Sequence, residues 1–459
     1  MDFEFLQDRV KPQAFGSNPM TFLNPIERDA FGLVMEILMI ETGGRKSWSS
    51  WQRRQVDTLV REIGKRSEFH RDRMNAYVTG KSSLSDLPVQ TRKDTVDQVL
   101  KEGSLVKATN KVGVGKNSTS GSGGTPITFY NTSINNKYQN LRGVAEDLAQ
   151  GNDYRDNVVR LLPVLAGEGM HEKTYLKAEI KKSIGPLSGL FRLGQRKYIY
   201  YRNCLDQLEK ELSKFPPHRL ASNPSMMDEI IAFGGVELLT ELGVRTWVPY
   251  AGARDFSQDE IFTSAGIDIR GNYSCQELGI IAYECAHHPG KFHVAVSNVI
   301  VELDDGQTAE FEGKTLSRVL VTGLHAYATP FLRYDIGDFA HLENNCPCGH
   351  DGPTLSHIFG RAKQFFTTPD GAQVYFNADA KIMNAMVRCQ EFRFHQINPE
   401  TVRVMIGGRD ELEASEIESL RQFVANRTSY PFDIELETVP EIDWSGNPKQ
   451  LAITSAVTP

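Results

Sequence analysis

Cysteine and histidine gather in two short segments of the sequence, and both residue types bind transition metals. The segment YECAHHPGKFHV contains Cys285 and three histidines, and the later segment CPCGH contains Cys346, Cys348 and His350. Zn²⁺ in structural sites takes four such ligands in a tetrahedron, so the two segments together supply enough donors for one ion. The Cys-x-Cys spacing is tighter than the Cys-x-x-Cys of most zinc fingers. The alternative interpretation is a set of reduced buried thiols and surface histidines.

We expect four of these residues, Cys285, His293, Cys346 and Cys348, to bind the ion. Pro289 and Gly290 favour a turn that returns the chain between Cys285 and His293. His293 is preferred because it opens the apolar segment HVAVSNVIV, where its placement is most rigid. The alternative histidine ligands are His287, His288 and His350. Four protein ligands leave no position for water, which predicts a structural zinc.

A glycine-rich loop, TSGSGGTP at residues 119–126, is the second segment whose residues could bind a ligand. Glycine permits the backbone conformations that turn successive N–H groups toward an anion, and serine and threonine add hydroxyl donors. The loop lacks the Gly-Lys-Ser/Thr of a Walker loop and is not a dinucleotide fingerprint. Phosphate binding and a plain flexible linker both fit this composition. The candidate phosphate-binding residues are Thr119, Ser120, Gly121, Ser122, Gly123 and Gly124.

Three further polar segments contain residue types that could bind the other parts of a nucleotide. NYSCQELG places Tyr273 four residues before Glu277, RYDIGD places Arg333 and Asp338 together in an expected loop, and FGR contains Arg361. Each alone also fits a structural role, such as a turn cap or a surface ion pair. Together they offer an aromatic ring for a base, carboxylates for Mg²⁺ and ribose, and a cation for phosphate.

The elements that must position these residues alternate between strands and helices, which indicates an α/β core. Residues 24–100 predict helices, ITFY and NVVRLLPVLAG predict strands, and LDQLEKELSKF and PSMMDEIIAFGGVELLTELGV predict amphipathic helices. RTWVPYAG and IDIRGNYS predict short strands. HVAVSNVIVEL and SRVLVTGL, separated by DDG, predict a hairpin in a second, β-rich layer. After FGRAK the pattern restarts as a small α+β unit.

Composition and charge narrow the class of protein. The chain has 459 residues, is 40% hydrophobic and 24% charged, and carries a net charge of −7. These values fit a soluble enzyme and provide no electrostatic basis for nucleic-acid binding. No apolar N-terminal signal and no membrane-spanning stretch is expected, so we predict a cytoplasmic protein.

In this order, the segments resemble those of the adenylate-forming (acyl/aryl-CoA ligase) superfamily, most of all its phenylacetate-CoA ligase-like branch. TSGSGGTP is similar to the phosphate loop TSGTTGxP, NYSCQELG to Tyr-Gly-x-Thr-Glu, and TPFLRYDIGD to Pro-x-x-Arg-Tyr-x-x-Gly-Asp. IFGRAKQ resembles Gly-Arg-x-x-Asp, and the Cys/His segments resemble a zinc knot of some members. The similarity extends from about residue 85 to the C-terminus.

The resemblance implies a two-step ligase in which a carboxylate attacks the α-phosphate of Mg·ATP and a thiol, usually of coenzyme A, then displaces AMP. It implies a large N-terminal domain over residues 1–360, with layered sheets and helices, and a small mobile α+β domain over residues 361–459. Glu277 would lie near Mg²⁺, Tyr273 on adenine, Asp338 on ribose and Arg361 near ribose or phosphate.

The sequence departs from the family pattern at three positions. Thr125 replaces a frequent lysine of the phosphate loop, and Gln364 replaces the hinge aspartate. Asn447 occupies the position of the adenylation lysine, and Lys449 follows two residues later. Lys449 is therefore either the catalytic lysine after a local shift or a solvated tail residue.

Three function classes remain open. The first is an acid–CoA ligase for an aromatic or small organic acid. The second is an acyl-protein synthetase or adenylating enzyme that passes the acyl group to a protein thiol or to an amine, and Cys389 is the candidate thiol acceptor. The third is a catalytically weakened homologue. The partner is therefore a small carboxylic acid with CoA or a carrier protein, and a homodimer is possible.

Overall fold

The protein is described here from a computed structural model. The described residues are 24–75, 77, 81–119, 127–163, 187, 191, 194–201, 205–232, 234–250, 259–311, 314–359, 365–371, 373–376, 378, 383, 386–389, 391–428, 430–443 and 452–457.

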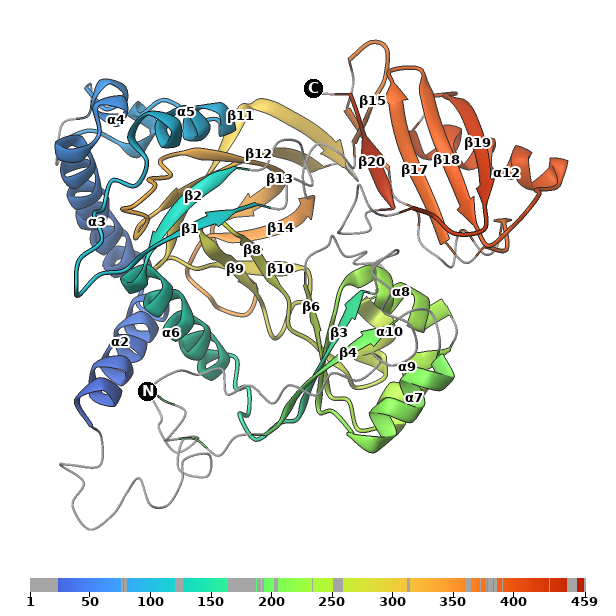
Figure 1. Cartoon of the computed structure of the whole chain (residues 1–459), viewed down its shortest axis with the longest axis horizontal. Helices are drawn as coiled ribbons and strands as arrows, with labels where there is room; N and C mark the ends of the chain where they lie inside the picture. Colours follow the sequence, from blue (N-terminus) through green and yellow to red (C-terminus); the bar gives the residue numbers. More distant parts are fainter. Residues whose placement is uncertain are drawn as a thin grey trace.

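The N-terminal part is helical, as the sequence predicts. Asn24 and Glu27 start the first helix by a reciprocal capping box, because each side chain accepts a hydrogen bond from the other's backbone N–H (3.0 and 2.9 Å). In Figure 1 these helices, drawn in blue, lie to one side of the strands. They are α2 (Pro25–Glu41), α3 (Arg45–Arg66), α4 (Glu68–Arg73), the 3-10 helix η2 (Leu84–Asp86) and α5 (Arg92–Glu102).

The glycine-rich loop joins two paired strands. Strands β1 (Val114–Ser118) and β2 (Thr128–Thr132) run antiparallel, with Ser118 opposite Thr128. The expected strand after the loop is thus present. Thr132 caps helix α6 (Ser133–Ala149), whose apolar face packs with that of α2 in one buried cluster. No expectation from the sequence anticipated α6.

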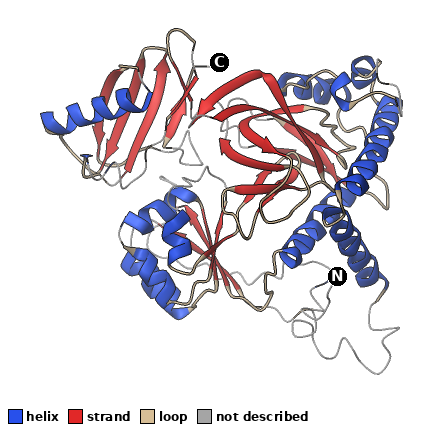
Figure 2. Ribbon diagram, turned by 180° about the vertical axis from the view of Figure 1, so that it is seen from behind, coloured by secondary structure: helices blue, strands red, loops and turns tan. Residues whose placement is uncertain are grey.

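A parallel five-stranded sheet forms the α/β part, with strand order β4-β3-β5-β6-β7. Both sheet and helices contribute to one buried core, for example Leu161 from β3, Leu212 from α7 and Trp247 from β6. In Figure 2 the helices of this part lie along one side of its strands. The elements are β3 (Val158–Pro163), β4 (Arg196–Tyr201), α7 (Leu205–Lys214), β5 (Arg219–Ser222), α8 (Pro224–Ala232), α9 (Gly235–Glu241), β6 (Thr246–Pro249), α10 (Asp259–Ser264) and β7 (Asp268–Ile269).

A seven-stranded antiparallel sheet forms the expected β-rich layer, in the order β11-β12-β13-β14-β10-β9-β8. Its strands are β8 (Asn272–Cys275), β9 (Gly279–Glu284), β10 (Lys291–Val294), β11 (Val299–Phe311), β12 (Lys314–Gly323), β13 (Tyr334–Glu343) and β14 (Thr354–Phe359).

Three sequence expectations need correction in this sheet. IDIRGNYS divides between β7 and β8, which belong to different sheets. HVAVSNVIVEL forms two strands separated by a turn at residues 295–298. The sequence did not indicate this turn, because Ala295 and Val296 are apolar like the strands on either side. The DDG segment lies inside β11 at a register shift, so the hairpin formed by β11 and β12 continues beyond it.

The last part of the chain contains its own sheet and its own buried core, including Phe394, Val404 and Val424. A four-stranded sheet of order β19-β18-β17-β20 carries helix α12, as Figure 1 shows. The elements are β15 (Phe365–Thr367), β16 (Gln373–Tyr375), β17 (Glu391–Asn398), β18 (Thr401–Gly407), α12 (Ala414–Thr428), β19 (Asp433–Val439) and β20 (Ile453–Ser455). None of the helices in the described ranges is long and apolar enough to cross a bilayer.

Candidate active site

Tyr273 and Asp338 meet across the antiparallel sheet. The Tyr273 hydroxyl donates a hydrogen bond to Asp338 Oδ2 at 2.7 Å. Their strands, β8 and β13, are four positions apart in the strand order, which would be about 19 Å in a flat sheet with strands 4.8 Å apart. The sheet therefore curls, and this curvature brings together two segments that are far apart in the sequence.

The contact leaves the tyrosine neutral and the carboxylate hydrogen-bonded. Burial and then the neighbouring Asp338 carboxylate raise the pKa of Tyr273 well above its ordinary value. Asp338 lies within strand β13 and not in the loop that the sequence predicted. Gly337 beside it has a φ of +91°, a conformation that glycine adopts readily.

Arg333, which the sequence placed in one loop with Asp338, contacts two other parts of the chain. Its guanidinium pairs with Glu302 at 3.2 Å and donates to the backbone carbonyl of Leu87 at 2.5 Å. It thereby ties the sheet to the segment before α5. Arg333 is thus a structural residue, although the sequence placed it beside Asp338.

Glu277 lies in the turn between β8 and β9, and only 6% of the residue is exposed. Mg²⁺ in nucleotide enzymes is commonly held by one or two carboxylates together with substrate phosphates. A buried carboxylate in the turn that follows Tyr273 fits that donor set.

The glycine-rich loop begins and ends at a closed hairpin. The backbone of Thr119 donates to the carbonyl of Ile127 at 3.0 Å, and the Thr119 hydroxyl accepts from the N–H of Ile127 at 3.0 Å. Ser120, Gly121, Ser122, Gly123 and Gly124, named above as phosphate-binding candidates, lie outside the described residues.

Arg92, at the start of α5, contacts a candidate site residue, and no motif in the sequence indicated it. Its guanidinium donates to the Thr119 hydroxyl at 3.4 Å. The two residues are 27 positions apart and belong to no common motif, so only the packing of α5 against the hairpin reveals the contact. Arg361 and Lys449, the other expected cations, lie outside the described residues.

The four expected zinc ligands come together. One donor atom from each of Cys285, His293, Cys346 and Cys348 lies within 4.8 Å of every other. The sulfur atoms of Cys285 and Cys346 are 3.8 Å apart, and Cys348 Sγ is 3.5 Å from His293 Nε2. Sulfur ligands about 2.3 Å from a tetrahedral zinc are separated by about 3.8 Å, so the donors fit this ion.

The loop that carries Cys346 and Cys348 is supported on both sides. His350 stacks on His293 with ring centroids 4.1 Å apart. At the start of α3, the backbone N–H of Arg45 donates to the Asp351 carboxylate at 3.2 Å, and Trp48 Nε1 donates to the Asp351 carbonyl at 3.3 Å. His287, His288 and His350 are not members of the four-residue donor group, which is the only such group among the described residues.

Known structures share the fold of this chain, although no family model and no curated protein sequence matches it. 2-Hydroxyisobutyryl-CoA ligase in the postadenylation state, in complex with 2-HIB-AMP, matches with a TM-score of 0.61 and 15% identity, covering 88% of this chain and 90% of that chain. The same ligase in an open conformation with 2-HIB-AMP and CoA matches with a TM-score of 0.52 and 16% identity, again covering 88% and 90%. In the thioesterification state it matches with a TM-score of 0.51 and 16% identity, covering 87% of this chain and 88% of that chain. The chain therefore has the fold of this CoA ligase, with a large N-terminal domain and a smaller C-terminal domain.

Proposed function

We propose that this chain uses ATP to activate a carboxylic acid as an acyl-adenylate and then transfers the acyl group to a thiol, with coenzyme A as the acceptor. The observation that carries the proposal is the hydrogen bond between Tyr273 and Asp338, which joins the two segments expected to hold adenine and ribose. The fold supports it, since the similar ligase was solved in complex with 2-HIB-AMP. From the motifs, the finer assignment is the phenylacetate-CoA ligase-like branch, with an aromatic or small organic acid as substrate.

In this proposal the polar residues bind and orient the nucleotide. The ring of Tyr273 stacks on adenine, and the Asp338 carboxylate accepts hydrogen bonds from the ribose hydroxyls. Glu277 holds Mg²⁺, which neutralises phosphate charge when it is bound. Arg361 contributes a positive charge near the ribose or the phosphates.

The first step needs charge neutralisation at phosphorus more than acid–base catalysis. The carboxylate oxygen of the acid bonds to the α-phosphorus, and the bond from this phosphorus to the bridging oxygen of pyrophosphate breaks. Residues 119–124 supply backbone N–H and hydroxyl donors to the phosphates. Arg92 adds positive charge at the beginning of this loop through its contact with Thr119. The family pattern instead has a lysine near the end of the loop, at the position of Thr125. Lys449 is the proposed lysine of adenylation.

The second step needs an accessible thiol acceptor. Burial raises the pKa of Cys389, the candidate acceptor named from the sequence, to about 11. A thiol with such a pKa is almost entirely protonated at neutral pH and is a poor nucleophile. This observation favours coenzyme A over acyl transfer to Cys389.

Zinc has a structural role in this proposal. Cys285, His293, Cys346 and Cys348 would fill all four positions of the tetrahedron, which leaves no open position for water. The ion would join the connection between β9 and β10 to the connection between β13 and β14.

The test is pyrophosphate release measured across a panel of carboxylic acids, with and without coenzyme A. We expect release that depends on ATP, Mg²⁺ and one class of acid, and thioester formation only when coenzyme A is present. Pyrophosphate release with no thioester would instead support a protein or amine acceptor. If ATP binds but no acid produces pyrophosphate, the chain is a catalytically weakened homologue and the proposal is wrong.

A further inference from the structure

Among the described residues, backbone pairing of strand β9 with β10 stops before it reaches the turn that carries Glu277. Strand β9 pairs with β8 on one side and with β10 on the other. The contact with the β10 side ends where Ala295 N–H donates to the carbonyl of Ile281 at 2.8 Å. The carbonyls of Leu278 and Ile280, next to Glu277, lie beyond this last backbone hydrogen bond.

Beyond the end of the β9–β10 pairing, the side chain of Asn298 donates hydrogen bonds to backbone carbonyls. Its amide nitrogen donates to the carbonyl of Leu278 at 3.0 Å and to the carbonyl of Ile280 at 2.6 Å. Carbonyls only accept hydrogen bonds, so the nitrogen and not the oxygen of this amide faces them. Asn298 is 2% exposed, so water does not replace these bonds if they are lost.

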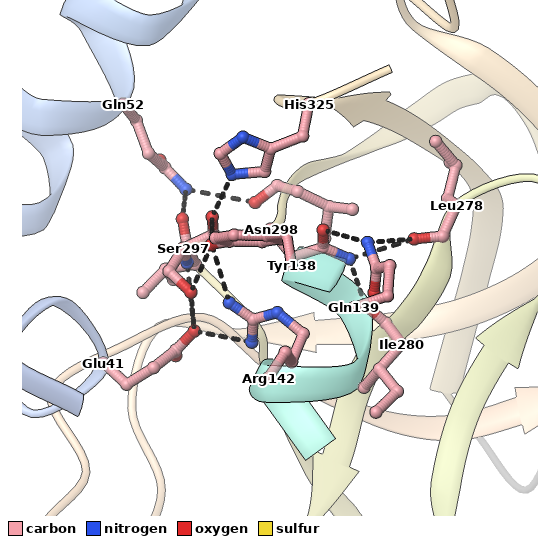
Figure 3. Close-up of polar contacts among 12 residues, drawn as sticks. Glu41, Gln52, Tyr138, Gln139, Arg142, Leu278, Ile280, Ser297, Asn298 and His325 are labelled. Atoms are coloured by element: carbon pink, nitrogen blue, oxygen red, sulfur yellow. Dashed lines mark hydrogen bonds and ion pairs between the residues drawn. The ribbon is translucent and has the colours of Figure 1, made fainter. Parts of the chain in front are cut away.

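Gln139, from helix α6, fixes the amide of Asn298 in this orientation. Gln139 Nε2 donates to Asn298 Oδ1 at 2.8 Å and to the Leu278 carbonyl at 3.3 Å, as Figure 3 shows. The side chain also covers the turn closely, since a Cβ at Gly279 would lie 2.5 Å from Gln139 Oε1. Gly279 has a φ of +72°, which favours glycine, and a Cβ there would force the Gln139 amide to move.

The residue before Asn298 is itself held by a buried polar network (Figure 3). Ser297 donates to the Glu41 carboxylate from its backbone N–H at 3.0 Å and from its hydroxyl at 2.7 Å. The Tyr138 hydroxyl donates to the Ser297 carbonyl at 2.7 Å, and Arg142 pairs with Glu41 at 3.1 Å. Asn298 therefore projects from a turn that is anchored to helices α2 and α6.

We infer that Asn298 and Gln139 are positioning residues that set the place of Glu277 for Mg·ATP. This inference rests on the proposed function, in which Glu277 holds the metal. The amides of Gln139 and Asn298 hold the backbone just after Glu277. Substitution of either amide should therefore shift the position of the Glu277 carboxylate but leave the carboxylate itself in the protein. Residues that orient metal ligands typically contribute about 10- to 100-fold to metal affinity when mutated.

The experiment measures how ATP binding to the full-length protein depends on the Mg²⁺ concentration, by calorimetric titration without any acid substrate. Gln139→Met keeps the length of the side chain and removes its amide, and Asn298→Ala removes both carbonyl contacts. We expect each to raise the Mg²⁺ concentration for half-maximal ATP binding by about 10-fold, while ATP binding in EDTA is unchanged. Glu277→Gln is the reference variant and should show the same shift or a larger one.

Tyr138→Phe is the matched control, because it removes a hydrogen bond of the same buried network that reaches Ser297 and not the Glu277 turn. It should lower the melting temperature yet leave the Mg²⁺ dependence at the wild-type value. If Gln139→Met shifts the Mg²⁺ dependence no more than Tyr138→Phe while Glu277→Gln does, the positioning role is overturned and the proposed function stands. If Glu277→Gln is also without effect, the assigned metal role of Glu277 fails, and the inference fails with it. Should Asn298→Ala not fold, Gln139→Met alone decides.

Discussion

At the scale of single residues, the structure pairs two groups that the motifs assign to different parts of a nucleotide. The Tyr273 hydroxyl already occupies one oxygen of Asp338. A ribose that binds Asp338 must therefore share this carboxylate with the tyrosine or displace it. The ring of Tyr273 and the carboxylate of Asp338 also hold each other in place, since each limits the rotation of the other.

This arrangement predicts different outcomes for two substitutions that break the same hydrogen bond. Asp338→Ala should weaken ATP binding by roughly 1.5–3 kcal/mol, which is about 10- to 150-fold, because charge-assisted hydrogen bonds to ribose are lost. Tyr273→Phe keeps the aromatic ring and the Asp338 carboxylate and removes only the hydrogen bond between them, so it should weaken binding much less. Calorimetric titration with ATP checks both. An equal loss of ATP affinity in the two variants would mean that binding depends on the hydrogen bond between Tyr273 and Asp338 and not on a contact between Asp338 and ribose.

At the scale of secondary-structure elements, the four proposed zinc ligands come from two hairpins of the antiparallel sheet. Cys285 follows β9 and His293 lies on β10, whereas Cys346 and Cys348 lie between β13 and β14. Strands β10 and β14 are neighbours, with His293 opposite Thr354. An ion at this position would hold together the ends of strands that are already paired, and β10 leads directly into the turn that contains Asn298.

Zinc removal should therefore lower the melting temperature of the protein. Protein purified without a histidine tag should contain about one zinc per chain, since four protein ligands form one tetrahedral site. Cys346→Ser should lower the zinc content and the melting temperature together, because metal binding contributes to the folding free energy. Cys389→Ser, a cysteine outside the donor group, is the control and should retain its zinc. Zinc-free wild-type protein with full stability would contradict the assignment.

At the scale of the whole molecule, the chain is similar to one ligase in several states. The TM-score is 0.61 for the postadenylation state and 0.51 for the thioesterification state, although both comparisons cover nearly the same share of the chain. The C-terminal part from Phe365 onward has its own sheet and core. We propose that residues 1–360 and 361–459 are two domains, and that the smaller one moves between the half-reactions.

Lys449 tests this proposal, because a lysine delivered by a moving domain serves only one of the two steps. Lys449→Ala should slow acid-dependent pyrophosphate release and spare acyl transfer from a supplied acyl-adenylate to coenzyme A. The two half-reactions are measured separately on the same preparation, so each is the control for the other. Equal loss of both, or of neither, would contradict the role of Lys449.

The sequence by itself determined the features that depend on side-chain type and local pattern. Cysteine and histidine are rare and chemically specific, so the donor set Cys285, His293, Cys346 and Cys348 was predicted before the structure brought it together. The N-terminal helices and the α/β core followed from the periodicity of apolar and polar residues and from the alternation of expected strands and helices. The nucleotide-site residues could be named in this way, but their roles stay predictions.

Only the tertiary structure decided which distant groups meet. The contact between Tyr273 and Asp338 depends on the curl of a seven-stranded sheet, and that of Arg92 with Thr119 depends on the packing of α5. Asn298 and Gln139 were invisible in the sequence because their partners are mainly backbone carbonyls, and every residue of a chain has one. A side chain that binds the backbone leaves no recognisable partner residue in the sequence, so only the folded chain reveals it.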